Sequence, residues 1–413
     1  MKIINNTKTP QIRFPEFTDD WQICKLKDIA DIFDGTHQTP QYTDSGVKFV
    51  SVENIANLET KKFISKEAYT KEYANKQAEK GDILMTRIGD IGTTKVIETK
   101  EPLAYYVTLA LLKPKDIISS FLAYAISSPK VQDDIYKRTL QVAFPKKINL
   151  GEINKIEIPI PSLPEQKKIG EFFHNLDNLI TAQNKKLDNL KQLKKGYLQK
   201  MFPSDGKTVP QIRFPEFTDP WVKRKLGRFG KATGGTSIES YFNASGKYKV
   251  ISIGSYSEQS VYTDQNIRID LNKKIKSRVL NKGDLTMILN DKTSSGNIIG
   301  RVLLIDEDDA YVYNQRTQRI EPNHNEYESQ FLYQLLNAPN IRSKIIKQAQ
   351  GNTQIYVNWS AISELDYFVP HTLAEQKKIG EFFQNLDNLI STQSDKIEAL
   401  RQHKKGILQK MFV

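Results

Sequence analysis

Two stretches of the chain, residues 163–202 and 372–413, carry apolar residues at alternating spacings of three and four positions. The seam positions of the first stretch are Ile169, Phe173, Leu176, Ile180, Gln183, Leu187, Leu190, Lys194, Tyr197 and Met201. Those of the second are Ile379, Phe383, Leu386, Ile390, Gln393, Ile397, Leu400, Lys404, Ile407 and Met411. Such a pattern predicts two long helices with a coiled-coil seam. Gln183 and Gln393 interrupt both seams at the same place, either as tolerated polar residues or as a pair that fixes the register.

The two stretches are near copies of each other. "EQKKIGEFFHNLDNLI" from Glu165 matches "EQKKIGEFFQNLDNLI" from Glu375 at 15 of 16 positions, and "KKGYLQKMF" matches "KKGILQKMF" at 8 of 9. Both copies begin with the form S/T-x-x-E, at Ser162 and Thr372, which predicts a capping box at each helix start. Pro203 is expected to end the first helix.

A second repeat frames the regions that precede these helices. "PQIRFPEFTDDW" at Pro10–Trp21 returns as "PQIRFPEFTDPW" at Pro210–Trp221, with 11 of 12 residues identical. The regions between frame and helix diverge and differ in length by about ten residues, as loops of divergent function do. Fainter echoes inside them, "KGDILM" against "KGDLTM" and "INLGEI" against "VNWSAI", predict that both regions share one fold.

The repeats describe a ring of two units that is open at one connector. Seven residues link Phe202 to Pro210, and ten would link Phe412 to Pro10 if the ends were joined. We therefore predict an α+β fold with two similar globular domains, joined by two long helices packed as an antiparallel coiled coil with pseudo-twofold, cyclic two-repeat character. The expected ranges are 1–162 and 203–371 for the domains, and 163–202 and 372–413 for the helices. The chain ends should lie within roughly 20 Å of each other.

Composition agrees with a globular protein of more than one domain. The 413 residues exceed the ~100–200 expected of a single domain, and 38% are hydrophobic. The start "MKIINNTKTP" lacks the apolar core of a signal peptide. The best membrane candidate, "LAYYVTLALL", has ten residues, well short of the ~20 that span a bilayer. A single cysteine, Cys24, forms no internal disulfide, so we expect a reducing, cytoplasmic setting.

The charge indicates a polyanionic partner, and the motifs exclude several classes of enzyme. The formal net charge is +12. It is spread along the chain, so binding needs local clusters. The sequence has no N/D-P-P-Y/F motif of an adenine methyltransferase and no G-x-x-x-x-G-K-S/T motif of a nucleotide-driven enzyme. The five histidines have no H-x-x-x-H or C-x-x-C partner. We predict no catalytic residue, no metal site and no cofactor bound by this chain.

Taken together, the motifs resemble those of one family, the specificity (S) subunits of Type I restriction-modification systems, over essentially the whole chain. The first variable region carries "DGTHQTPQYTDSGVKFVSVENI" and "KGDILMTRIGDIG", which resemble the family's glycine/threonine loop and its G-D-I-L strand. The second carries "TGGTSIESYFNASGKYKVISI", "KGDLTMILND" and "YNQRTQRIEP". It departs from the pattern in having "GGTS" without the following proline and "LND" in place of "RIG".

The resemblance implies a DNA-binding subunit that is not itself an enzyme. Each variable domain would be a target-recognition domain for one half of a bipartite DNA site, and the helices would set the spacing between the halves. In the family, two modification subunits dock on the S subunit and use S-adenosylmethionine to methylate adenine N6. Restriction subunits that use ATP and Mg²⁺ join the same complex and cut unmethylated DNA. The alternative is a coiled-coil scaffold that binds protein without specific DNA recognition.

Candidate DNA-binding residues are polar side chains in glycine-rich loops, together with two adjacent lysines. For each of them, a structural turn or a fold-stabilising hydrogen bond is the competing interpretation. The candidates are Thr36, His37, Gln38, Arg87, Lys146 and Lys147 in the first domain, and Thr236, Lys292, Arg316, Gln318, Asn352 and Gln354 in the second. The repeated helices also keep polar residues that a helix-pair core does not require, either for partner docking or because the duplication is recent. These candidates are Asn175, Asp177, Asn178, Asn385, Asp387 and Asn388.

Overall fold

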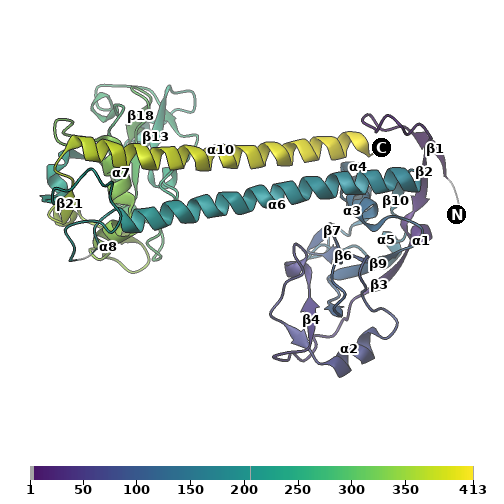
Figure 1. Ribbon diagram of the computed structural model, residues 1–413. Helices are drawn as coiled ribbons and strands as arrows, with labels where there is room; N and C mark the ends of the chain where they lie inside the picture. The colour runs from purple at the N-terminus through teal and green to yellow at the C-terminus, as the bar shows by residue number, and fades with distance from the viewer. Residues whose placement is uncertain (1–3, 205, 413) are drawn as a thin grey trace. The chain divides into compact units, whose positions relative to one another are not determined.

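The computed structural model describes residues 4–204 and 206–412. The chain forms two compact units, the first from residues 1–184 and 395–413 and the second from residues 185–394. Two long helices, α6 (Leu163–Lys200) and α10 (Leu373–Met411), each contribute residues to both units (Figure 1). The predicted long helices are therefore confirmed. The first one ends at Lys200, because Met201 and Phe202 turn away before Pro203.

The first unit contains three sheets, with strand orders β1-β2-β10, β3-β9-β6-β7 and β5-β4-β8. All pairings are antiparallel except β4 with β8. The strands are β1 (Ile4–Lys8), β2 (Trp21–Lys25), β3 (Ala30–Asp34), β4 (Val47–Val50), β5 (Phe63–Ile64), β6 (Ile83–Ile88), β7 (Asp90–Val96), β8 (Leu103–Tyr105), β9 (Leu109–Pro114) and β10 (Glu157–Ile160). The helices are α1 (Leu26–Ile29), α2 (Lys66–Tyr73), α3 (Ser119–Ser127), α4 (Pro129–Arg138) and α5 (Leu150–Ile153), with a 3-10 turn η1 (Val52–Asn54).

The second unit repeats this plan, with strand orders β11-β21, β12-β19-β15-β17, β14-β13-β18 and β16-β20. The strands are β11 (Val222–Lys225), β12 (Gly230–Gly234), β13 (Tyr248–Ile251), β14 (Arg268–Ile269), β15 (Leu285–Ile288), β16 (Asn290–Asp291), β17 (Val302–Leu304), β18 (Tyr311–Tyr313), β19 (Thr317–Pro322), β20 (Ile355–Tyr356) and β21 (Asp366–Val369). The helices are α7 (Ser329–Asn337), α8 (Pro339–Ile346) and α9 (Trp359–Ile362), with 3-10 turns η2 (Leu226–Arg228), η3 (Glu239–Tyr241), η4 (Ile253–Ser255) and η5 (Lys276–Arg278). The four-stranded sheet and the sheet with one parallel pair recur in the same order, so the divergent regions share a fold as predicted.

An aromatic cluster in each unit includes the end of a long helix that comes from the other repeat. In the first unit, the ring centroid of Phe412 lies 6.0 Å from Trp21, 5.7 Å from Phe121 and 6.0 Å from Phe173. In the second unit, Phe202 takes the same place and lies 6.4 Å from Trp221, 5.9 Å from Phe331 and 5.8 Å from Phe383. Each core is therefore completed by the last residues of the other copy's helix, and this explains why "LQKMF" is repeated.

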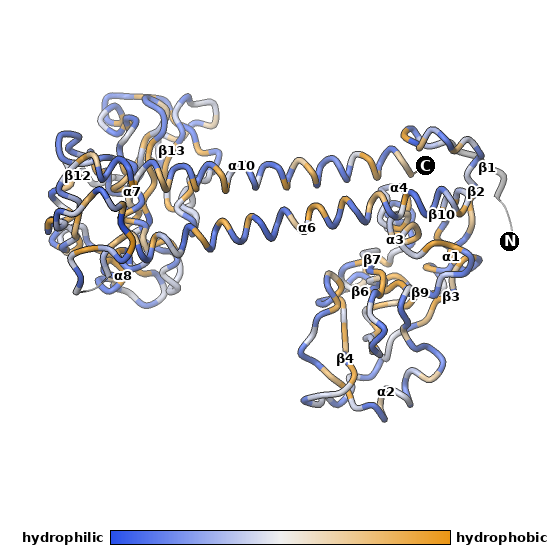
Figure 2. Tube along the Cα trace, in the orientation of Figure 1, coloured by the Kyte–Doolittle hydropathy of each residue, from blue (hydrophilic) through white to orange (hydrophobic). Residues whose placement is uncertain are grey.

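Within each unit, the segments of α6 and α10 run antiparallel along the predicted seam. In the first unit, Lys404 Nζ lies 2.6 Å from Asp177 Oδ1, and Arg401 Nη2 donates to Asn184 Oδ1 at 3.3 Å. In the second, Lys194 Nζ lies 2.5 Å from Asp387 Oδ1. Figure 2 shows the apolar positions recurring along both helices among hydrophilic ones. The described seam positions are buried or half-buried, which confirms the pattern.

The predicted capping boxes are not formed, because the glutamates serve another purpose. Glu165 accepts two hydrogen bonds from the Arg13 guanidinium, both at 2.8 Å, and Glu375 accepts the equivalent pair from Arg213 at 2.7 and 2.8 Å. Only half of one box is present, since the Glu375 amide donates to Thr372 Oγ1 at 3.3 Å. The ion pair with Glu165 raises the pKa of Arg13. The repeated segment "PQIRFPEF" is thus fastened to the start of the long helix by a nearly buried, bidentate ion pair.

The residues that follow each glutamate hold the domain against the helix. Gln166 Oε1 accepts from the Ile118 amide, and Gln376 Oε1 accepts from the Glu328 amide, both at 3.0 Å. A side chain at Gly170 would place its Cβ 2.3 Å from Ser120 Oγ, so the close approach of α3 requires glycine there. Much of the repeated "EQKKIGEFF" is therefore explained by contacts within the chain.

The contacts near the two connectors are equivalent, as the ring predicts. The amides of Gln11 and Ile12 donate to the Lys410 carbonyl at 2.9 and 3.1 Å, and the Ile212 amide donates to the Lys200 carbonyl at 3.0 Å. Met1 and Val413 themselves lie outside the described residues. Across residues 4–204 and 206–412, no helix has a run of apolar residues long enough to cross a bilayer.

Candidate nucleic-acid interface

The first candidate segment of the first unit is the turn after β3. Gly35 packs against the backbone of Tyr106, where an added Cβ would lie 2.3 Å from the Tyr106 carbonyl oxygen. This close packing buries Thr36, while His37 and Gln38 are exposed. The His37 ring Nε2 lies 2.7 Å from Asp34 Oδ2. His37 and Gln38 are therefore the side chains of this turn that are available to a ligand.

Arg87 lies inside the unit, at the end of β6. Its guanidinium pairs with Asp34, and its Nε donates to the Ile148 carbonyl at 3.3 Å. Its side chain is 8% exposed. This placement favours a fold-stabilising role for Arg87 over direct contact with bases. Through Asp34 it orders the turn that presents His37.

Lys146 and Lys147 are exposed at the end of a loop that we call the 140–147 loop. The Leu140 amide donates to the Lys147 carbonyl at 2.9 Å, and the Gly89 amide donates to the Lys146 carbonyl at 2.9 Å. Since Ile148 also bonds to Arg87, a chain of contacts joins this loop to Arg87, Asp34 and His37. The candidate segments of the first domain, far apart in sequence, therefore meet in one region of the unit.

In the second unit, Lys292, Arg316, Asn352 and Gln354 are exposed and lie on neighbouring segments. The Leu289 amide donates to the Arg316 carbonyl at 2.8 Å, and the Leu289 carbonyl accepts from the Val357 amide at 2.9 Å. β16 then pairs with β20, placing the segment that begins at Lys292 beside the one that ends at Gln354. Arg316 has a φ of +69°, a strained conformation for a side-chain-bearing residue.

Thr236 and Gln318 lie close to the turn that carries Arg316, because the Gly235 amide donates to the Thr317 carbonyl at 2.8 Å. Thr236 Oγ1 accepts from Arg278 Nη2 at 2.8 Å, and the Arg278 guanidinium lies 5.2 Å from the Tyr313 ring centroid. Gln318 is buried in the sheet between Gly234 and Met287. Its placement favours the structural interpretation, whereas Thr236 is exposed.

Several residues that organise this surface were absent from the sequence-based candidates. Asp34 connects His37 with Arg87, and Arg278 holds Thr236. Phe144 and Val142 are fully exposed at the tip of the 140–147 loop. Asp34 could have been found from the sequence because it directly precedes Gly35 of the turn. The 140–147 loop could have been found because a mostly apolar stretch directly precedes Lys146 and Lys147.

The docking candidates on the helices divide into two groups. Asp177 accepts from Lys404 and, at 2.8 Å, from the Tyr124 hydroxyl, and Asp387 accepts from Lys194 and from Gln334 Nε2 at 2.9 Å. Burial and the Asp177 carboxylate raise the pKa of Tyr124. These contacts within the chain are a sufficient reason for the repeat of both aspartates. Asn175, Asn178, Asn385 and Asn388 are exposed, as partner docking requires, and that role stays a prediction.

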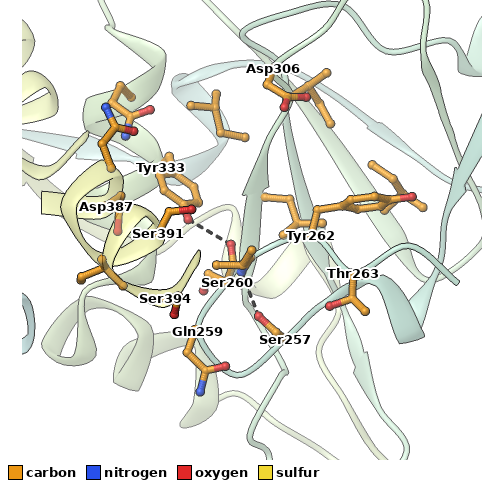
Figure 3. Close-up of a pocket in the computed structure, with 18 of the residues that line it drawn as sticks. Ser257, Gln259, Ser260, Tyr262, Thr263, Asp306, Tyr333, Asp387, Ser391 and Ser394 are labelled. Carbon is orange, nitrogen blue, oxygen red and sulfur yellow. Dashed lines mark hydrogen bonds between the residues drawn. The ribbon is translucent and has the colours of Figure 1, made fainter. Parts of the chain in front are cut away.

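A hollow of about 920 Å³ opens beside Asp387 in the second unit. Figure 3 shows Asp387, Ser391 and Ser394 of α10 facing the loop that carries Ser257, Gln259 and Ser260. The Tyr333 hydroxyl donates to the Ser260 carbonyl at 2.9 Å and supports that loop. Hydroxyl groups dominate the labelled lining, together with the carboxylates of Asp306 and Asp387. No group of three or more His, Cys, Asp or Glu that could hold a metal was found in the part of the chain that the structure describes.

Comparison with known proteins gives consistent matches over both repeats. The family model described as "Type I restriction modification DNA specificity domain" matches residues 18–192 and 218–402. The MjaVIII specificity subunit of Methanocaldococcus jannaschii is 27% identical over 72% of this chain and 73% of its own length. The putative MjaX specificity subunit of the same organism is 26% identical over 95% of this chain and 93% of its own.

Solved structures show the same fold at low sequence identity. The crystal structure of an S subunit from M. genitalium matches with a TM-score of 0.63 and 15% identity, covering 98% of this chain and 99% of that one. A chain from a type I R-M system matches with a TM-score of 0.58 and 13% identity, covering 95% and 97%. The two-repeat fold is thus shared over nearly the full length of both chains.

Proposed function

Because the chain belongs to the Type I restriction modification DNA specificity family, we propose that it directs such a complex to a bipartite DNA site. Each globular domain reads one half of the site, and α6 and α10 set the distance between the halves. The domains correspond to residues 1–162 and 203–371, and the helical segments to residues 163–202 and 372–413. The protein-only scaffold fits less well, because it leaves the divergent loops without a purpose.

One observation carries this proposal: the units repeat their frame contacts and differ in their exposed loops. The Arg13–Glu165 and Arg213–Glu375 pairs join equivalent residues, and the Phe412 and Phe202 clusters contain equivalent aromatic residues. At equivalent loop positions, however, the first unit presents Lys146 and Lys147, whereas the second has the buried Ile355 and the exposed Tyr356. A frame built twice suits identical partners, whereas different loops suit different base sequences.

The catalytic chemistry belongs to the partners in this proposal. Two modification subunits dock on the repeated frame, bind S-adenosylmethionine and methylate adenine, and restriction subunits supply ATP- and Mg²⁺-dependent cleavage. This chain contributes double-stranded DNA recognition and is not itself an enzyme. Its proposed location is the cytoplasm, where the DNA is. The exposed Asn175 and Asn385 lie at equivalent frame positions, as docking of identical partners requires.

The test is a map of N6-methyladenine across a host genome, with the modification subunits expressed and this chain present or absent. We expect a split motif that disappears on deletion. An exchange of residues 22–160 for the same region of a related protein should change one half of the motif, and the matched exchange of residues 222–369 should change the other. A methylation map that deletion leaves unchanged contradicts the proposal.

A further inference from the structure

The 140–147 loop of the first unit carries an unusual set of side chains for a surface loop. Phe144 and Val142 are about 100% and 98% exposed, and Tyr136 and Leu140 beside them are also exposed. A phenylalanine ring held fully in water is unfavourable, so such a group marks a contact surface when it lies at a loop tip. Lys137, Lys146 and Lys147 lie close to it in the sequence and are exposed.

The loop is held at its base, so its tip is presented from a defined place. The Leu140 amide donates to the Lys147 carbonyl at 2.9 Å, and the Ile148 amide donates to the Arg87 carbonyl at 3.0 Å. Lys147 also forms a bridge with Ile88 at the end of β6. Phe144 therefore projects from the same region that presents His37 and Lys146.

The second unit has a loop at the equivalent place with different chemistry. There the Gln350 amide donates to the Tyr356 carbonyl at 2.9 Å, and the Val357 amide donates to the Leu289 carbonyl at 2.9 Å. Counting back from Ile148 and Val357, Phe144 corresponds to Thr353. The tip "GNTQ", residues 351–354, is polar and closed by Gly351 at a φ of +98°.

This difference identifies the occupant. A surface for an identical protein partner should appear in both units, as the Arg13 and Arg213 pairs do. The apolar tip appears in one unit only, so it faces something that differs between the two halves. Residues 136–147 contain no acidic residue and four basic ones. Arg138 pairs with Asp134 and Glu152, and the other three, Lys137, Lys146 and Lys147, are exposed, which fits a polyanion. A DNA half-site satisfies both conditions.

We propose that the 140–147 loop is a DNA wedge, in which Phe144 enters between two base pairs of the first half-site. Val142 packs against the same step, and Lys146 and Lys147 contact the flanking phosphates. Proteins that kink DNA use apolar side chains in this way and offset the cost of unstacking with additional contacts. The inference rests on the proposed DNA recognition and adds an asymmetry between the two halves of the site.

The test uses the full chain assembled with its modification subunits and a duplex that carries the bipartite site from the methylation map. In Phe144→Ala we expect DNA binding to be roughly 5- to 150-fold weaker, the range found when an aromatic side chain that stacks on a base is removed. Phe144→Trp should restore binding. Thr353→Ala, at the equivalent tip of the second unit, is the matched control for the fluorescence signal below.

A fluorescent base separates insertion from a general loss of affinity. 2-Aminopurine, placed in turn at each step of the first half-site, should brighten at one step when the original protein binds, because its stacking is lost. That signal should vanish with saturating Phe144→Ala and persist with Thr353→Ala. Lys146→Gln with Lys147→Gln should reduce the slope of log K against log salt by roughly 2.

Three results would overturn the wedge. Phe144→Ala could bind as tightly as the original protein, its fluorescence signal could remain, or the variant could lose assembly with the modification subunits while its fold is intact. Loss of assembly would show that the loop tip binds the modification subunits and not DNA. If the methylation map shows no motif that depends on this chain, the proposed function itself fails. A motif that is present and insensitive to Phe144 rejects the wedge alone.

Discussion

Phe412, which directly follows α10, should stabilise the first unit. Its side chain is 4% exposed and packs between Trp21, Phe121 and Phe173. Truncation of a buried phenylalanine to alanine costs about 3–5 kcal/mol. We therefore expect Phe412→Ala to destabilise the first unit by about 3–5 kcal/mol, and Phe202→Ala to destabilise the second unit by a similar amount.

The measurement should resolve the two units, because one melting temperature does not describe two units that unfold separately. Native-state hydrogen exchange provides this resolution. A loss of about 3 kcal/mol corresponds to amide exchange roughly 10²-fold faster in the most protected segments of the first unit, such as β6 and β9. The second unit should change little. Leu179→Ala, at an exposed position of α6, is the control and should stay within about 0.5 kcal/mol of the original protein.

One result would refute this reasoning. If Phe412→Ala leaves exchange in β6 and β9 unchanged while Phe202→Ala accelerates exchange in β15 and β19, the end of α10 does not complete the first core. The ring would then be closed at one connector only.

Three further predictions follow from the frame. Arg13→Ala leaves the nearly buried Glu165 carboxylate without its cation and should lower the free energy of unfolding of the first unit alone by about 3–5 kcal/mol. Hydrogen exchange measures this loss, and an equal effect in both units would contradict the prediction. A circular permutant that joins Val413 to Met1 and opens between Ser204 and Lys207 should fold with an unchanged circular dichroism spectrum, and an unfolded product would argue against the ring. Four residues inserted between Lys186 and Leu187 lengthen α6 by roughly 6 Å and rotate it by about 400°, so the preferred half-sites should lie one or two base pairs further apart than in the original site. An active variant that keeps the original spacing on a panel of synthetic sites would show that the helices do not set this distance.

The features that could be predicted from the sequence are those that depend on the spacing of apolar residues or on the repeat of whole segments. The seam of α6 and α10 and the shared fold of the two domains follow from spacing and from comparing the copies. Features that depend on tertiary contacts were missed. The S/T-x-x-E form at Ser162 looked like a capping box, yet Glu165 pairs with Arg13, which lies 152 residues away. The docking interpretation of Asp177 rested on its repeat in both helices, and the sequence did not show that Lys404 and the Tyr124 hydroxyl contact it.

The candidate loops show the same limit. Arg87 and Lys146 are both basic candidates, and nothing in the sequence around them shows which one is exposed. β6 lies in the middle of its sheet and is buried along most of its length, so the Arg87 guanidinium is taken up by Asp34 and Ile148. Lys146 lies on the loop between α4 and α5 and stays exposed. The burial of β6 gives Arg87 a structural role and leaves Lys146 as the exposed residue. The spacing of residues in the sequence does not reveal this burial for a polar side chain.

The arrangement of contacts separates stability from recognition. The residues that hold each unit together lie at the ends of the domain and on the helices, at Arg13, Glu165, Phe173 and Phe412 in the first unit. The exposed loop tips make few buried contacts, so substitution there costs little stability. The first unit can therefore carry Phe144 at its loop tip, and the second Thr353 at the equivalent place, without any change in the contacts that both units share. Because each core is completed by the helix end of the other repeat, neither half of the chain contains a complete frame by itself. Selection on the frame thus constrains both repeats together, whereas each set of loops remains free to diverge.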